Sequence, residues 1–146
     1  MEALIFAFSV LLAPVVLAFL EARGDAQRIE FGLPIDHASS AALRLAILVP
    51  LALWATWPPP TLVRGSGLPP LEVWLWVGDI VAASGLSLSI FWLSFDIMLN
   101  SMRGLPLTYV GKEAEADQLL GYLSPASRIW LKVGLMVMFS IILILA

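Results

Sequence analysis

The sequence predicts an all-α integral membrane protein with four transmembrane helices and a short interfacial helix before the last span. Apolar residues make up 60% of the 146 residues and charged residues 13%, whereas soluble domains have about 45–50% and 25%. The mean hydropathy is +0.94, so a soluble fold would expose large apolar patches. Four segments have lengths suited to a hydrocarbon core of about 30 Å: residues 3–20, 41–57, 72–98 and 126–145. We expect residues 1–146 to form one membrane domain.

The first expected span, residues 3–20, contains no charged residue. A cleaved signal peptide would carry a basic n-region and a small-residue cleavage site. Here only Glu2 precedes the apolar run, and Glu21 and Arg23 follow it. We therefore expect a retained span, kinked at Pro14, which neighbouring helices tolerate in a membrane.

Residues 21–40 form the first expected polar loop, which mixes both signs of charge. Gly24, Gly32 and Pro34 argue against one long helix through this segment. A side-chain oxygen is expected to cap the next helix by accepting backbone N–H groups. The candidates are Asp36, Ser39 and Ser40.

The second expected span, residues 41–57, ends at a run of three prolines that begins with Pro58. Arg44 lies in its first turns, where a long cationic side chain reaches the interface along its own aliphatic stem. Trp54 and Trp57 mark the opposite interface. The loop that follows, residues 58–70, is rich in proline and glycine and is expected to be irregular.

The third expected span begins near Leu71 and can continue to Asn100. A helix of that length is about 45 Å long, so it must tilt or project into the headgroups. Two small-xxx-small pairs in this span predict close packing against other helices. These pairs are Gly78 with Ala82 and Gly85 with Ser89.

The chain after the third span turns at Gly104 and Pro106. Residues 111–123 combine a charged half with a leucine-rich half, which predicts a short helix on the membrane surface. Ser124 and Pro125 favour the start of the last helix, with serine at the cap and proline in the first turn.

Basic residues concentrate around the first and third loops: Arg23, Arg28, Arg44, Arg103, Lys112, Arg128 and Lys132. The second loop has only Arg64, and the termini have none. The positive-inside rule therefore predicts that both large loops are cytoplasmic and both termini lie outside. The expected location is a bacterial inner membrane or a viral membrane.

Polar residues of the second and third spans are expected to meet at this cytoplasmic surface. His37 and Arg44 are seven residues apart and share a helix face, and Asp96, Asn100 and Arg103 are spaced four and three apart on another. We expect an Asp96–Arg44 pair with Asn100 and His37 nearby. One interpretation is a site for a proton, an ion or a headgroup. The favoured interpretation is a structural clasp between the two helices.

Asp79 is a second candidate, eight residues into the third span. A carboxylate in hydrocarbon costs a few kcal/mol unless it is protonated, paired or hydrated. Asp79 is therefore a candidate for an ion pathway or a lumen. The favoured alternative places it among the headgroups.

Composition argues against several classes of function. The chain has no cysteine and one histidine, which do not build the usual zinc sites. Serines occur without a G-x-S-x-G context, and a net charge of −3 without a basic run gives no support for nucleic-acid binding. We expect no enzymatic activity, no cofactor and no metal.

Two segments form a wider pattern: HASSAALR at residues 37–44 and FDIMLNSMRGLPLTYVGK at residues 95–112. A histidine and an arginine open one span, and a D-x-x-x-N-x-x-R-G-x-P-x-x-Y-x-G run closes the next. In this pattern the chain resembles small polytopic membrane proteins of unknown function that bacteriophages and prophages encode. The resemblance implies a viral membrane component. It transfers no catalytic residue, because the family has no established activity.

The sequence thus favours a non-enzymatic structural or scaffolding membrane protein in the lipid bilayer, packed as a homo-oligomer or as a subunit of a larger membrane assembly. Two alternatives stay open. One is a holin-like pore, in which Asp79, Ser84, Ser87 and the small residues of the third span line a wet lumen in an oligomer. The other is an accessory subunit of a respiratory or photosynthetic membrane complex.

Overall fold

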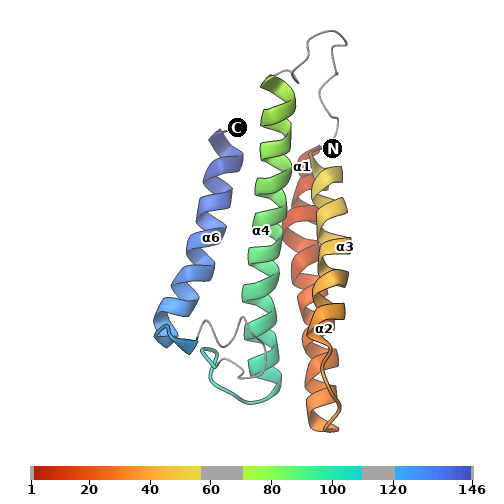
Figure 1. The fold of residues 1–146 in the computed structure, drawn as a ribbon, viewed down its shortest axis with the longest axis vertical. Coiled ribbons are helices and arrows are strands. Elements are labelled where there is room, and N and C mark those ends of the chain that lie inside the picture. Colours follow the sequence, from red (N-terminus) through yellow and green to blue (C-terminus); the bar gives the residue numbers. More distant parts are fainter. Residues whose placement is uncertain (1, 57–70, 110–120, 146) are drawn as a thin grey trace.

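The computed structural model describes residues 2–56, 71–109 and 121–145, and these residues contain helices and turns but no β-strand (Figure 1). The elements are α1 (Glu2–Phe6), the π-helix η1 (Ala7–Leu12), α2 (Ala13–Glu30), α3 (His37–Ala55), α4 (Leu71–Met102) and α6 (Pro125–Leu145). Four helical segments are long and apolar enough to cross a membrane: Leu4–Glu30, Ala38–Ala55, Val73–Met102 and Pro125–Leu145. The predicted all-α membrane fold with four spans is confirmed.

Two predicted features lie outside the described residues. The proline-rich loop at residues 58–70 is one of them. The short interfacial helix expected at residues 111–123 falls mostly in the other, because the description resumes only at Gly121.

Helix α4 is the central element. It packs against α2, α3 and α6, whereas α6 packs chiefly against α4. Figure 1 shows α6 on one side of α4 and the first two spans on the other. Two buried apolar clusters hold the first three spans together. One contains Val10, Ala52, Ala83, Leu86 and Ile90, and the other contains Ala18, Leu48 and Phe91.

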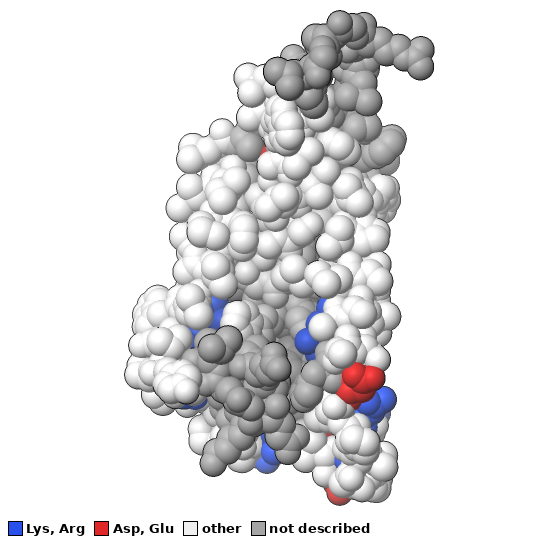
Figure 2. Space-filling view, in the orientation of Figure 1, with Lys and Arg blue, Asp and Glu red and all other residues white. Residues whose placement is uncertain are grey.

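Charged side chains gather at one end of the molecule. Figure 2 shows most of the Lys, Arg, Asp and Glu side chains in its lower part, below a broad uncharged surface. Both chain termini lie at the opposite end (Figure 1). This distribution is the one expected from the loops, and the assignment of that end to the cytoplasm stays a prediction.

The first span contains a local change of helix type next to Pro14. In η1 the hydrogen bonds reach one residue further than in an α-helix, and the Ala13 N–H donates to the Phe8 carbonyl. In an α-helix the Val10 carbonyl would accept from residue 14, but proline has no N–H. The buried Ser87 hydroxyl of α4 donates to this carbonyl at 3.4 Å. The proline thus frees a carbonyl that ties the first span to α4.

Two glycines end the helices at the charged end. Gly32 and Gly104 adopt left-handed backbone conformations, with φ of 66° and 64°. After α2 the Leu33 N–H donates to the Arg28 carbonyl, and after α4 the Leu105 N–H donates to the Asn100 carbonyl. These bonds form Schellman motifs, which satisfy the last carbonyls of each helix.

The expected polar loop at residues 21–40 begins later than predicted. Helix α2 continues through Gly24 to Glu30. Of the three residues expected to interrupt a helix, only Gly32 and Pro34 stand outside one. Glycine lowers the stability of a helix interior by only about 1 kcal/mol, which the long contact of α2 with α4 offsets. The prediction that Gly24 helps to end the first helix was wrong.

Side-chain caps start α3 and α6. The Asp36 carboxylate accepts from the backbone N–H groups of Ala38 and Ser39 at 3.1 and 3.0 Å, and from the Ser39 hydroxyl. Ser124 Oγ accepts from the Ser127 N–H at 3.1 Å, and Pro125 is the first residue of α6. Of the three candidate caps for the second span, the structure uses Asp36.

The small residues of α4 differ in how closely another helix approaches them. Ala82 is buried, and the Ser89 hydroxyl donates to the Gly85 carbonyl at 2.7 Å. A Cβ atom at Gly85 would collide with the ring of Phe139 on α6, whereas a Cβ at Gly78 would meet nothing within 4 Å. Close helix packing therefore occurs at Gly85, and the space around Gly78 is open.

These two glycines give a matched test of helix packing. Gly85→Ala should lower the free energy of unfolding by about 1–3 kcal/mol, because the Phe139 ring must move. Gly78→Ala should be neutral or raise it by up to about 1 kcal/mol, because alanine favours the helix and has room. Thermal unfolding of both variants in detergent measures the difference. Equal effects of the two substitutions would contradict the packing at Gly85.

The cap of α3 predicts a dependence of stability on pH. The Ser39 hydroxyl and backbone N–H hold the pKa of the Asp36 carboxyl below its ordinary value of 3.8. The capping contribution is therefore complete above about pH 4 and is lost as the pH falls through the lowered pKa. Asp36→Asn keeps a capping oxygen without a titrating group, so its acid dependence should be weaker. Helix content measured by circular dichroism against pH compares the two proteins.

Candidate functional site

The first contact of the charged end joins α2 to α3 beside α4. Arg44 Nε lies 2.7 Å from Glu21 Oε2, and both side chains are largely buried. The guanidinium also lies over the rings of Phe91 and Phe95, at 4.8 and 5.2 Å from their centroids. The two rings are stacked with centroids 5.7 Å apart. One arginine therefore contacts two other helices through an ion pair and cation–π contacts.

The second contact joins α4 to α6. The Lys132 ammonium forms an ion pair and hydrogen bond with the Asp96 carboxylate. It also lies 4.3 Å from the centroid of the Trp92 ring. Lys132 is only 3% exposed, although a lysine ammonium inside a span is costly without a partner. The carboxylate and the aromatic face together compensate its charge.

These pairs correct the expected Asp96–Arg44 pair. Successive residues of an α-helix are rotated by about 100°, so Phe95 and Asp96 point to different sides of α4. The Phe91 and Phe95 side faces α3 and receives Arg44. The side of Trp92 and Asp96 faces α6 and receives Lys132. In place of the expected clasp, the structure has one ion pair between α2 and α3 and another between α4 and α6, beside neighbouring sides of α4.

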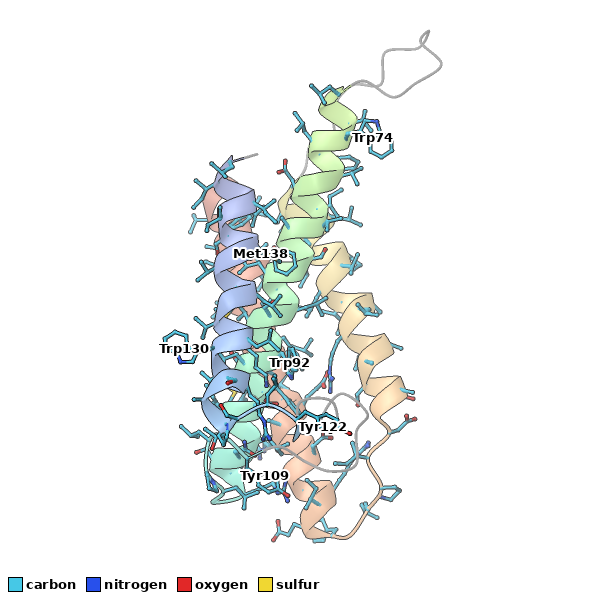
Figure 3. All side chains as sticks on the ribbon, turned by 60° about the vertical axis from the view of Figure 1, so that its left-hand side comes forward. Trp74, Trp92, Tyr109, Tyr122, Trp130 and Met138 are labelled. Atoms are coloured by element: carbon cyan, nitrogen blue, oxygen red, sulfur yellow. The ribbon has the colours of Figure 1, made fainter. Side chains whose placement is uncertain are left out.

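Asn100 and Arg103 serve the turn that follows α4. Asn100 is buried, and its Nδ2 donates to the carbonyls of Leu107 and Tyr109 at 3.3 and 2.9 Å. The Arg103 guanidinium lies 5.6 Å from the centroid of the Tyr109 ring, and Figure 3 shows Tyr109 at the lower end of the bundle. His37 is the first residue of α3. The five residues predicted to cluster are thus divided: Arg44 and Asp96 belong to two separate ion pairs, Asn100 and Arg103 to the turn after α4, and His37 to the start of α3.

Asp79 lies on α4, toward the end away from the charged cluster. It is partly exposed, and within the described parts of the chain it has no hydrogen bond or ion pair. Trp74 lies one turn further out and points away from the bundle (Figure 3), with 60% exposure. An exposed tryptophan near a helix end is typical of the membrane interface. This favours a position of Asp79 close to the headgroups.

The sequence interpretation missed Glu21 and Lys132 as partners, although the sequence contains a signal for both. Asp96 stands six residues before the end of α4, and Lys132 stands seven residues after the start of α6. Consecutive antiparallel spans bring such positions to the same depth. Glu21 and Arg44 have a similar relation across the loop between α2 and α3. A search for opposite charges at equal distances from the loop that joins two consecutive spans would have identified both pairs.

The described residues at this end offer the chemistry of paired charges. The described residues contain no group of three or more histidine, aspartate or glutamate side chains that could hold a metal ion. A cavity of about 80 Å³ lies between α4 and α6 beside Asp96 and Lys132, and its lining is mainly apolar. Comparisons with protein-family models, curated proteins and solved structures find no match.

The Asp96–Lys132 pair predicts a large effect on stability. Asp96→Ala leaves the buried Lys132 ammonium without its carboxylate and should lower the free energy of unfolding by about 3 kcal/mol. Asp79→Ala is the matched control on the same helix and should be neutral or stabilising, since it removes a carboxylate without a partner. Thermal unfolding in detergent measures both.

A double variant separates the pair from general damage to α4. Asp96→Leu combined with Lys132→Met replaces both charges by apolar groups, which is often neutral or stabilising at buried pairs. It should recover most of the stability that Asp96→Ala loses. Equal loss in the single and double variants would contradict the ion pair as the cause.

Proposed function

We propose that this chain is a non-enzymatic structural membrane protein that packs with copies of itself or with partner membrane proteins. The supporting observation is the use of the charged groups inside the spans. Glu21 pairs with Arg44, and Asp96 pairs with Lys132. Each pair connects two helices, as expected of groups that fix the arrangement of a bundle. The proposal includes a role as a viral membrane component, which the resemblance to phage-encoded proteins implies.

The surface of the outer helices supports a role in assembly. Few residues of α3 and α6 are buried inside the described part of the chain. Trp130 points away from the bundle (Figure 3) and is 71% exposed. Large exposed aromatic and aliphatic side chains are available to lipid or to another membrane helix.

The position of two serines argues against the pore alternative. Ser87 is fully buried and donates to the Val10 carbonyl, and the Ser84 hydroxyl oxygen is also buried. A lumen shared between copies of the chain would need these hydroxyls on an outer surface. Asp79 is partly exposed and makes no hydrogen bond or ion pair with the described residues, so it is the lumen candidate that the packing leaves open.

The proposal predicts a discrete assembly without conductance. Native mass spectrometry of the protein extracted gently from its source membrane should show a homo-oligomer or a complex with other membrane proteins. Induced expression should leave the membrane potential unchanged, as measured with a potential-sensitive dye. A monomer alone in gentle detergent would contradict the proposal. Depolarisation that Asp79→Asn abolishes would replace it with a pore.

A further inference from the structure

An open hollow of about 500 Å³ lies between the charged ends of α2 and α4. It is separate from the two ion pairs described above. Helix α2 contributes Arg23, Gln27, Ile29 and Glu30, and the end of α4 contributes Met102 and Arg103. Polar and apolar groups therefore border the same space.

The polar part of the hollow suits a phosphate group. Two arginines line it, and a guanidinium donates N–H groups in a fork that matches two phosphate oxygens. The Gln27 side chain supplies a further amide donor. Among the described lining residues Glu30 is the one carboxylate, so the formal charge of these residues is +1. The Tyr109 ring under Arg103 restricts that arginine before any ligand binds.

The apolar part suits a lipid better than a soluble anion. Ile29 is 36% exposed and Met102 is 42% exposed, and both line the same hollow as the two arginines. A phospholipid presents the same combination, with a phosphate next to glycerol and acyl chains. A soluble anion would gain nothing from the two apolar side chains.

The depth of the hollow also fits a headgroup. The helical segments Leu4–Glu30 and Val73–Met102 have 27 and 30 residues, or about 40 and 45 Å of helix. Both exceed a hydrocarbon core of about 30 Å. Their charged ends therefore extend into the headgroup layer. Arg23 stands seven residues before the end of α2, and Arg103 directly follows α4.

We propose that this hollow binds the phosphate of an anionic phospholipid, with Arg23 and Arg103 as its ligands and Ile29 and Met102 against the acyl-glycerol part. Basic pockets between transmembrane helices are suited to such headgroups. The site would hold a lipid at the groove between the first and third spans. It does not depend on the function proposed above.

Lipid retention tests the site. The whole protein is delipidated in mild detergent and titrated with phosphatidylglycerol or phosphatidylcholine, and bound lipids are counted by native mass spectrometry. The wild-type protein should retain phosphatidylglycerol several-fold more tightly than phosphatidylcholine. Arg23→Gln should weaken that binding about fivefold, and Arg103→Gln should do the same. Arg28→Gln is the control, because it removes the same charge from α2 outside the hollow and should change nothing.

Two results would contradict a specific lipid site. Equal retention of the two lipids by wild type would overturn the site. An equal effect of Arg28→Gln and Arg23→Gln would reduce it to general surface charge. Arg23 is exposed on a helix surface, so its variant is expected to fold even if Arg103→Gln disturbs the contact with Tyr109.

A second arm distinguishes a lipid from a soluble anion. Met102→Gln should weaken phosphatidylglycerol retention, because the acyl-glycerol part loses an apolar contact. Inorganic phosphate at millimolar concentration should not displace the lipid. Displacement by phosphate, together with unchanged retention in Met102→Gln, would assign the hollow to a soluble anion and overturn the lipid site.

Discussion

A lysine that is almost completely buried determines how the last helix joins this protein. Helix α6 packs chiefly against α4, and Lys132 enters that contact with a charge that hydrocarbon does not solvate. It can be buried there only because Asp96 and the face of Trp92 meet it. In a bilayer, apolar burial does not drive helices together as it does in water. A polar pair of this kind therefore fixes both the depth and the rotation of α6.

The same helix organises the other side of the bundle by different means. Phe91 and Phe95 are offset by one position from Trp92 and Asp96, and they receive the guanidinium of Arg44. Further along α4, contact depends on size, since Gly85 admits the Phe139 ring. Near the first span it depends on a hydrogen bond from Ser87 to a carbonyl that Pro14 leaves available. Helix α4 thus uses three kinds of contact at different positions: charged side chains on aromatic rings, a close steric fit at Gly85, and a hydrogen bond to a backbone carbonyl.

Properties that depend on local sequence were predicted well. Hydropathy and length gave the four spans, and the serine–proline pair marked the start of α6. The pairing of charges depends instead on how α4 is rotated, and one residue of rotation separates the Phe95 side from the Asp96 side. Spacing within single helices placed Asp96, Asn100 and Arg103 on one face, but it carried no information on which neighbour that face meets. The partners Glu21 and Lys132 required a comparison of depth between helices.

The two ends of α4 are constrained to different degrees, and this difference bears on how the protein is used. At the charged end, two ion pairs, two Schellman motifs and the Asn100 bonds to the following turn restrict the helices. At the other end the described contacts are fewer, and the Trp76 indole donates to the Thr56 carbonyl at 3.0 Å. The contacts at the charged end fix the positions of the helix ends around the hollow that Arg23 and Arg103 line. Toward the other end, α4 carries Asp79 and has open space around Gly78, so its packing there depends less on close contacts within the chain.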